Sequence, residues 1–245
     1  NDWSNCYDNI FRANTVLDNL AIITEPDLST SNNIKGQALF LRARCLLQAL
    51  SLWAVAYDQT TANTDPGVPL RLGSDVNEKI SRASIQEGYD RIITDLKEAA
   101  DLVPVTQVST MRPNKGAALG LLARTYLWMR KYDSCFKYAN LALALNDQLY
   151  DYNSISNVNA SYPFPVFSEN PEILYNATMQ SIPMIQNSKA RMDTTLYQSF
   201  DGNDLRKTVF FKNVWNGKLA FRGSCEYGSP PFDGVATDEI YRMRA

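Results

Sequence analysis

Apolar residues recur at three- and four-residue intervals through much of the chain, and the clearest run lies between Ile34 and Tyr57. This spacing places side chains on one face of a helix. The stripe consists of Ile34, Ala38, Leu41, Cys45, Ala49, Leu52, Trp53 and Ala56. It predicts a helix over residues 34–57 whose apolar face packs against other helices.

Boundary signals predict a helix on each side of this one. A stripe from Trp3 to Ala21 predicts a helix that closes at Glu25-Pro26, because proline disfavours helical backbone in the residue before it. Ser84-Ile-Gln-Glu87 has the spacing of a capping box, in which serine and glutamate satisfy free N–H groups reciprocally at a helix start. We expect this third helix to run to a stop at Pro104.

Two further stretches, residues 117–129 and 134–145, predict a helical hairpin with Asp133 as the N-cap of the second arm. Small residues in both arms permit the close helix pairing of tetratricopeptide repeats, and the helices at 34–57 and 84–103 then form an enlarged preceding unit. We therefore predict a mainly α fold: a tetratricopeptide-like helical repeat scaffold with long loops and a small β-hairpin.

Two segments interrupt the helical pattern. Residues 58–82 are rich in Thr, Asn, Asp, Pro and Gly and predict a long surface excursion, which is uncommon unless it serves a function. After Leu149, aromatic residues and prolines crowd the sequence, with a short strand expected at 172–177 and a hairpin over 208–222 that turns at Asn216-Gly217. We expect a helical scaffold over 1–149 and a loop-rich, aromatic-rich part over 150–245 of the same domain.

The predicted hairpin also fixes which side chains share a face. A two-residue turn at Asn216-Gly217 pairs Trp215 with Lys218 and Asn213 with Ala220. Trp215 then lies on the more polar face, beside the tip of the hairpin.

Composition limits the partners and the catalytic chemistry that we expect of this chain. The net charge of −2 provides no basic field for nucleic acid or for an anionic membrane surface. The chain has no histidine, so it lacks the commonest general base and metal ligand, and we expect no catalysis, no metal and no cofactor. The four cysteines, Cys6, Cys45, Cys135 and Cys225, form no C-x-x-C pair and leave three disulfide pairings open, although Cys45 and Cys135 fit buried positions in helices.

Several motifs in order resemble the SusD/RagB family of outer-membrane nutrient-binding lipoproteins. The resemblance begins with Trp3-x-x-x-Tyr7-x-x-Ile10-x-x-Ala13-Asn14 and continues with Ile34-x-Gly-Gln-Ala-x-Phe-Leu-Arg-Ala43 and Pro66-Gly-Val-Pro-Leu70. The stretches 84–102, 115–127, 204–206 and 239–245 follow in the family's order. One departure is Gln37, which stands where the family commonly has glutamate.

The resemblance implies a surface-exposed lipoprotein of the cell outer membrane that binds starch, another glycan or another nutrient and does not catalyse a reaction. In such Bacteroidetes-type polysaccharide utilization, the ligand passes to a SusC-like TonB-dependent transporter. The lipid-anchoring cysteine of the family lies outside this sequence, so we interpret the chain as a fragment without the N-terminal anchor region and the C-terminal part. Contact with a membrane is expected only through that anchor.

Aromatic side chains supply the candidate ligand-binding residues, because their flat apolar faces can cover a sugar ring. The chain has 13 Tyr, 10 Phe and 4 Trp. The candidates are Trp215 first and Tyr227 second, then Trp3, which could equally pack in the core, and Asp201 and Asn203 as hydrogen-bonding partners of hydroxyls. For Asp204 a turn or capping role is favoured, for Trp53 and Trp128 packing, and for Asp95 and Glu98 a solvated helix face.

Two other classes of protein stay open. A tetratricopeptide-type scaffold for protein–protein interaction explains the helices without a sugar, but the long excursion is atypical of it. A carbohydrate-active enzyme needs two carboxylates held across a cleft, which the sequence does not indicate. The sequence leaves open which glycan or nutrient is bound.

Overall fold

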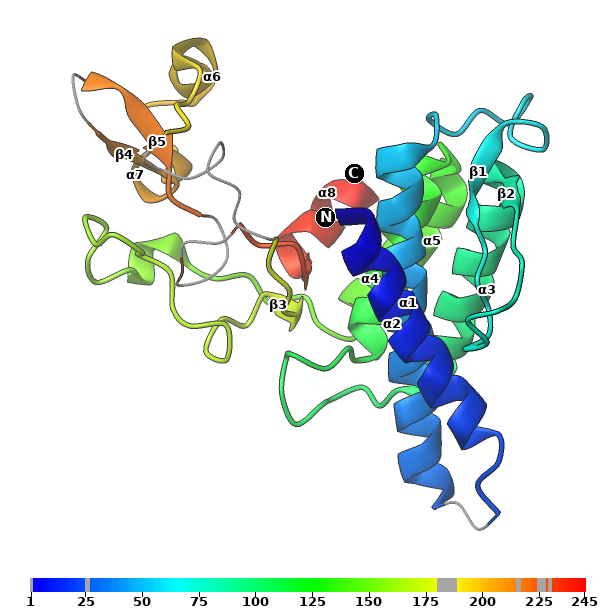
Figure 1. The fold of residues 1–245 in the computed structure, drawn as a ribbon. Coiled ribbons are helices and arrows are strands. Elements are labelled where there is room, and N and C mark those ends of the chain that lie inside the picture. Colours follow the sequence, from blue (N-terminus) through cyan, green and yellow to red (C-terminus); the bar gives the residue numbers. More distant parts are fainter. Residues whose placement is uncertain (1, 25–26, 180–188, 215–216, 224–227, 229–230) are drawn as a thin grey trace. The chain divides into compact units, whose positions relative to one another are not determined.

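The computed structural model describes residues 2–24, 27–179, 189–214, 217–223, 228 and 231–245. The fold is mainly α, as predicted, with few and short strands among the described residues (Figure 1). The chain divides into two compact units. Unit 1 comprises residues 1–108, 112–146 and 239–245, and unit 2 comprises residues 109–111 and 147–238. The predicted division at 149/150, within a single domain, stays a prediction.

Unit 1 is built from helices that pack in chain order. They are α1 (Asp2–Leu20), α2 (Leu28–Trp53), α3 (Ile85–Leu102), α4 (Lys115–Trp128), α5 (Tyr132–Leu143) and most of α8 (Thr237–Arg244). Helix α2 packs between α1 and α3, and α4 packs between α3 and α5 (Figure 1). The largest fully buried side chains include Phe40, Leu46, Ile92, Leu96 and Leu121, so the core of unit 1 lies between these helices.

The predicted bounds of α2 were wrong at both ends. The helix begins at Leu28, because the carboxylate of Asp27 accepts a hydrogen bond from the Ser29 N–H (3.2 Å) and acts as its N-cap. It ends at Trp53, and the next residue is extended. The predicted stripe also fails there, since Leu52 is 61% exposed.

The capping box of α3 is confirmed. The Ser84 hydroxyl accepts from the Glu87 N–H at 3.2 Å, and the Glu87 carboxylate accepts from the Ser84 N–H at 2.7 Å. Asp133, in contrast, lies inside the first turn of α5 and is not its N-cap; that position belongs to Lys131, whose side chain makes no capping bond. The turn before it is too short to place Asp133 outside the helix, and Arg130 closes it in the left-handed region (φ 57°).

The excursion between α2 and α3 contains a strand pair that the sequence did not reveal. Strand β1 (Pro66–Pro69) runs antiparallel to β2 (Arg82–Ser84). The strands approach closely at Gly67, where a Cβ atom would lie 2.7 Å from the carbonyl oxygen of Ser84. Only glycine fits such an approach of two backbones.

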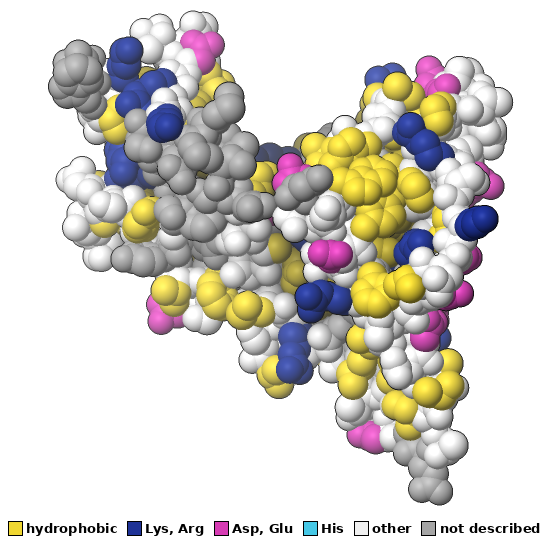
Figure 2. Space-filling model, viewed as in Figure 1, with side chains coloured by type: hydrophobic (Ala, Val, Ile, Leu, Met, Phe, Trp, Pro, Cys, Tyr) yellow, Lys and Arg dark blue, Asp and Glu magenta, His cyan; other side chains and the backbone are white. Residues whose placement is uncertain are grey.

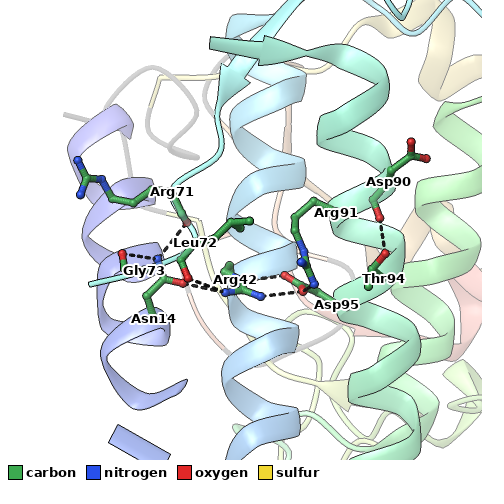
Figure 3. A network of polar contacts seen from close by, with 9 residues as sticks. All are labelled: Asn14, Arg42, Arg71, Leu72, Gly73, Asp90, Arg91, Thr94 and Asp95. Carbon is green, nitrogen blue, oxygen red and sulfur yellow. Dashed lines mark hydrogen bonds and ion pairs between the residues drawn. The ribbon is translucent and has the colours of Figure 1, made fainter. Parts of the chain in front are cut away.

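A buried polar network joins the excursion to three helices (Figure 3). The guanidinium of Arg42 donates through Nε and Nη2 to the two carboxylate oxygens of Asp95, at 2.7 and 2.8 Å. Its Nη1 donates to Oδ1 of Asn14 at 2.9 Å, and the Asn14 amide in turn donates to the carbonyl oxygens of Arg71 (3.0 Å) and Gly73 (3.1 Å). The network therefore fixes residues 71–73 against α1 and α2.

The prediction that Asp95 lies on a solvated helix face was wrong. Asp95 is 0% exposed and also accepts a charge-assisted bond from Arg91, so it does not belong to a solvated face. Asp95 lies one helical turn from Ile92 and Ala99, which are both buried, so the helical period places it on the buried face of α3. Glu98 is partly exposed, with its carboxylate 2.6 Å from Lys35.

Unit 2 has shorter elements around an aromatic core. They are the 3-10 turn η1 (Tyr152–Ser154), β3 (Ile173–Tyr175), α6 (Thr194–Ser199), α7 (Arg206–Val209), β4 (Phe211–Asn213), β5 (Leu219–Phe221) and β6 (Val235–Ala236). Strand β3 pairs antiparallel with β6, and β4 with β5. Phe164, Phe210 and Phe211 are buried in one core cluster with Ile155 and Val209.

The hairpin of β4 and β5 exists, but its predicted register was wrong by one residue. Asn213 pairs with Leu219 rather than with Ala220, and Phe211 pairs with Phe221. The Val214 N–H donates to the carbonyl of Lys218, which leaves three residues in the connection, and Gly217 adopts φ +68°. A three-residue connection with glycine in the left-handed region shifts the pairing relative to a two-residue turn.

Candidate functional site

Three aromatic side chains meet on unit 1 where α1 begins and α2 ends. Trp3 and Tyr7, one turn apart on α1, have ring centroids 4.6 Å apart. Trp53, the last residue of α2, stands edge-on to Trp3 at 4.9 Å with an interplanar angle of 77°. All three are half-buried. We call Trp3, Tyr7 and Trp53 the aromatic cluster; it offers partly exposed ring surface held by mutual packing.

The phenol of Tyr7 ties this cluster to the excursion. Its hydroxyl donates to the carbonyl oxygen of Pro69 in β1 at 2.8 Å. Burial, and to a lesser extent the neighbouring Cys6, raises the pKa of Tyr7 to about 12, against an opposing effect of Arg82. The phenol therefore stays protonated at neutral pH and remains a hydrogen-bond donor to the loop.

Arg82 of β2 lies against the same cluster. Its Nε donates to the carbonyl of Gly67 at 2.6 Å, and Nη2 donates to the carbonyls of Trp53 (3.0 Å) and Pro66 (3.3 Å). A cation at the carbonyl end of α2 is favourable because that end carries partial negative charge. The residue as a whole is exposed, so the charge is both fixed in place and accessible to solvent.

Apolar side chains extend the surface around the cluster. Leu52 and Val55, which lie beside Trp53 in the sequence, are each 61% exposed. Figure 2 shows hydrophobic side chains gathered over the start of α1 and the end of α2. This part of unit 1 is therefore a surface suited to binding an apolar or amphipathic face.

The predicted residues Asp201 and Asn203 lie together in unit 2, in one exposed turn. The Asn203 N–H donates to Oδ1 of Asp201 at 2.9 Å, so this carboxylate supports the turn. Asp204 accepts from the Arg206 N–H at 3.0 Å and pairs with its guanidinium, and that hydrogen bonding lowers the pKa of Asp204. The favoured turn-forming role of Asp204 is thus confirmed, whereas the N-cap position of α7 belongs to Leu205.

The other predicted ligand-binding residues do not lie in this turn. Trp3 lies in unit 1, and Trp215 and Tyr227 lie outside the described residues. Tyr7 and Trp53 were not predicted as neighbours of Trp3, although the four-residue spacing of Trp3 and Tyr7 was a usable signal. The sequence contains no signal for Arg82, because a strand of three residues has no periodicity to detect.

The described part of the chain contains no group of three His, Cys, Asp or Glu side chains that could hold a metal ion. Cys6, Cys45 and Cys135 are buried, and Cys225 lies outside the described residues. Among the described helices, none has both the length and the apolarity required to cross a membrane.

Helices packed in pairs, a long anchored excursion and a half-exposed aromatic cluster define a helical-repeat protein with a surface suited to ligand binding. The chain belongs to the SusD-like family described as starch-binding and associating with the outer membrane, whose model matches residues 1–127. The members of this family are carbohydrate-binding proteins without catalytic activity.

One relative is similar to this chain in sequence, and two solved structures share its fold. The chain is 31% identical over 127 residues to the SusD-like protein P2 of Formosa agariphila. The matched region covers 51% of this chain and 23% of that protein. A putative sugar binding protein of Bacteroides vulgatus has the same fold, with a TM-score of 0.81, 21% identity, and coverage of 99% of this chain and 59% of that one. A laminarin binding SusD-like protein gives a TM-score of 0.66 at 16% identity, over 99% and 65% of the two chains.

Proposed function

We propose that this protein binds a glycan at the outer membrane surface, that the aromatic cluster of unit 1 is part of its binding surface, and that the glycan passes to a SusC-like TonB-dependent transporter. The observation that carries the proposal is the half-exposed, edge-to-face pair of Trp3 and Trp53, held by Tyr7 against β1. The carbohydrate-binding character of the family and the laminarin binding relative support it.

The chemistry fits a sugar ring. The C–H groups on one face of a pyranose make an apolar patch that an indole can cover, while hydroxyls at the ring edge need hydrogen-bonding partners. Arg82 is a polar group beside the cluster, and its guanidinium has only donors, which suits hydroxyl oxygens.

Unit 2 supplies a second set of proposed contacts. Asp201 and Asn203 are exposed and adjacent, and Trp215 and Tyr227 remain candidates on the grounds of their sequence context. The surface location, the lipid anchor and the transporter partner are also proposals, supported by the family description of association with the outer membrane.

The test is a calorimetric titration of the protein with maltoheptaose, laminarin oligosaccharides and xyloglucan oligosaccharides. We expect Trp3→Ala to weaken binding at least tenfold, which corresponds to about 1.4 kcal/mol. Trp128→Ala is the matched control, because Trp128 is 39% exposed on α4 and lies outside the cluster. Trp215→Ala and Tyr227→Ala examine the unit 2 candidates in the same assay.

Each outcome has a definite meaning. Equal binding by the wild type and Trp3→Ala contradicts the assignment of the aromatic cluster. Failure of the wild type to bind any glycan contradicts the proposed function itself. Circular dichroism of each variant separates loss of binding from loss of fold.

A further inference from the structure

The geometry around the aromatic cluster points to a charged ligand: we propose that the glycan bound there carries a carboxylate or sulfate group and that Arg82 receives it. This inference rests on the proposed function, because it names the chemical class of glycan for the same surface. A uronic acid and a sulfate ester share the feature that matters, a planar or tetrahedral set of anionic oxygens on a sugar ring.

Arg82 is held in position by neutral groups only. Its Nε and Nη2 donate to the backbone carbonyls of Gly67, Trp53 and Pro66. Among the described residues, Nη1 has no such bond. The backbone therefore orients the guanidinium without neutralising it, and one of its two terminal nitrogens keeps its donors for a ligand.

Arg82 also lacks a counter-ion, a feature that it shares with Arg71 among the described residues. No carboxylate of the described residues lies within 4.0 Å of a nitrogen of Arg82. Arg42, Arg91 and Arg124 of the same unit each pair with an aspartate or glutamate.

The acidic residues that flank the two strands, Asp65 before β1 and Glu87 after β2, are engaged with other partners. The Glu87 carboxylate bonds to the Ser84 N–H and hydroxyl, and the Asp65 carboxylate accepts from Thr61. An exposed, oriented and uncompensated cation beside two tryptophans suits an amphipathic anion, whose ring covers an indole while its charged group meets the guanidinium.

The magnitude follows from the hydrogen bond types. A bond between a guanidinium and an anionic oxygen contributes about twice as much as one to a neutral hydroxyl, so a charged glycan gains about tenfold in affinity over its neutral counterpart. Because Arg82 is exposed to solvent, this gain falls as salt screens the charges.

The experiment compares two matched pairs of ligands by calorimetry. One pair is oligogalacturonate and its fully methyl-esterified form; the other is a sulfated carrageenan oligosaccharide and its desulfated form. We expect the wild type to bind at least one charged member about tenfold more tightly than its neutral partner, with the preference lost between about 50 and 500 mM NaCl. Which pair responds identifies the anionic group.

Variants locate the effect. Arg82→Gln should abolish the charge preference, and Arg82→Lys, which keeps the charge but not the fork of donors, should retain part of it. Arg71→Gln is the matched control, because Arg71 also lies in the excursion and donates to backbone carbonyls, of Asp75 and Glu78, but should leave the preference unchanged. Thermal melting of each variant verifies the fold.

Two results overturn the inference in distinguishable ways. Equal binding of charged and neutral members, with Trp3→Ala still impairing both, leaves the proposed function in place and removes the role of Arg82. A charge preference that persists in Arg82→Gln also removes it. If no ligand of either pair binds, the inference fails, and the wild-type titrations with neutral glucans described above decide separately whether the proposed function fails with it.

Discussion

Replacement of Asp95 is the sharpest test of how unit 1 is held together. Asp95 lies on α3 with 0% exposure, and its carboxylate accepts from Nε and Nη2 of Arg42 and from Arg91. Asp95→Ala removes the acceptor but leaves the Arg42 guanidinium buried, since that residue is only 5% exposed. The variant therefore measures the cost of an uncompensated buried cation.

The expected loss follows from this geometry. Breaking a buried ion pair by removing one partner costs about 3–5 kcal/mol, because the remaining charge cannot return to water without unfolding. Asn14 still accepts one bond from Arg42 at 2.9 Å, and the second cation, Arg91, is partly exposed, so we expect a value of about 3 kcal/mol. The double variant Arg42→Met with Asp95→Leu should recover most of this loss, because it removes both charges together.

The assay is urea denaturation of each variant, read as a change in midpoint at constant slope. Glu98→Ala is the matched control: it breaks the Lys35–Glu98 pair between the same two helices, whose side chains are 45% and 40% exposed. Exposed pairs contribute about 1 kcal/mol or less. If Asp95→Ala destabilises no more than Glu98→Ala, the network is not the stabilising element inferred from its burial.

Two further predictions concern the excursion and its aromatic contacts. Gly67→Ala should destabilise the protein by about 1–3 kcal/mol, because its new Cβ meets backbone atoms of Ser84 and Ala83 at 2.7–3.0 Å; Gly73→Ala, which meets nothing within 4 Å, should be near neutral in the same denaturation assay. Burial raises the pKa of Tyr7 to about 12, so the unfolded phenol loses its proton at lower pH than the folded one. The protonated phenol therefore contributes to the unfolding free energy in full below about pH 10, and this contribution is lost between about pH 10 and 12. Tyr7→Phe should reduce the decline in unfolding free energy over that pH range. An unchanged decline would contradict the assignment of this titration to Tyr7.

Local signals in the sequence predicted local structure well. The capping box at Ser84 and Glu87 fixed the start of α3, because its two bonds lie within four residues. The start of α2 was missed because Asp27 caps a polar first turn that lacks the apolar stripe. The hairpin in unit 2 was found, but its register depended on the length of the turn, which the Asn-Gly pair did not determine.

Contacts between distant segments were harder to predict. Asp95 was assigned to a solvated face on the basis of its charge, although its helical position beside Ile92 and Ala99 was buried. Its partner Arg42 lies 53 residues away, and no local pattern reveals such a pair. Trp3 was identified as a candidate, but its neighbours Trp53 and Arg82 join it only through the packing of α2 and the pairing of β2.

The family motifs contact one another in the folded protein. Tyr7 and Asn14, both in the first motif, bond to the carbonyls of Pro69, Arg71 and Gly73 in the excursion, and Arg42 of the second motif bonds to Asn14. The Pro-Gly-Val-Pro motif is the strand whose glycine permits the close approach of β2. We expect the loss of any one of these contacts to loosen the excursion, whose last residue, Arg82, lies beside the tryptophans. The motif residues therefore act together to position the excursion, which in turn completes the proposed binding surface.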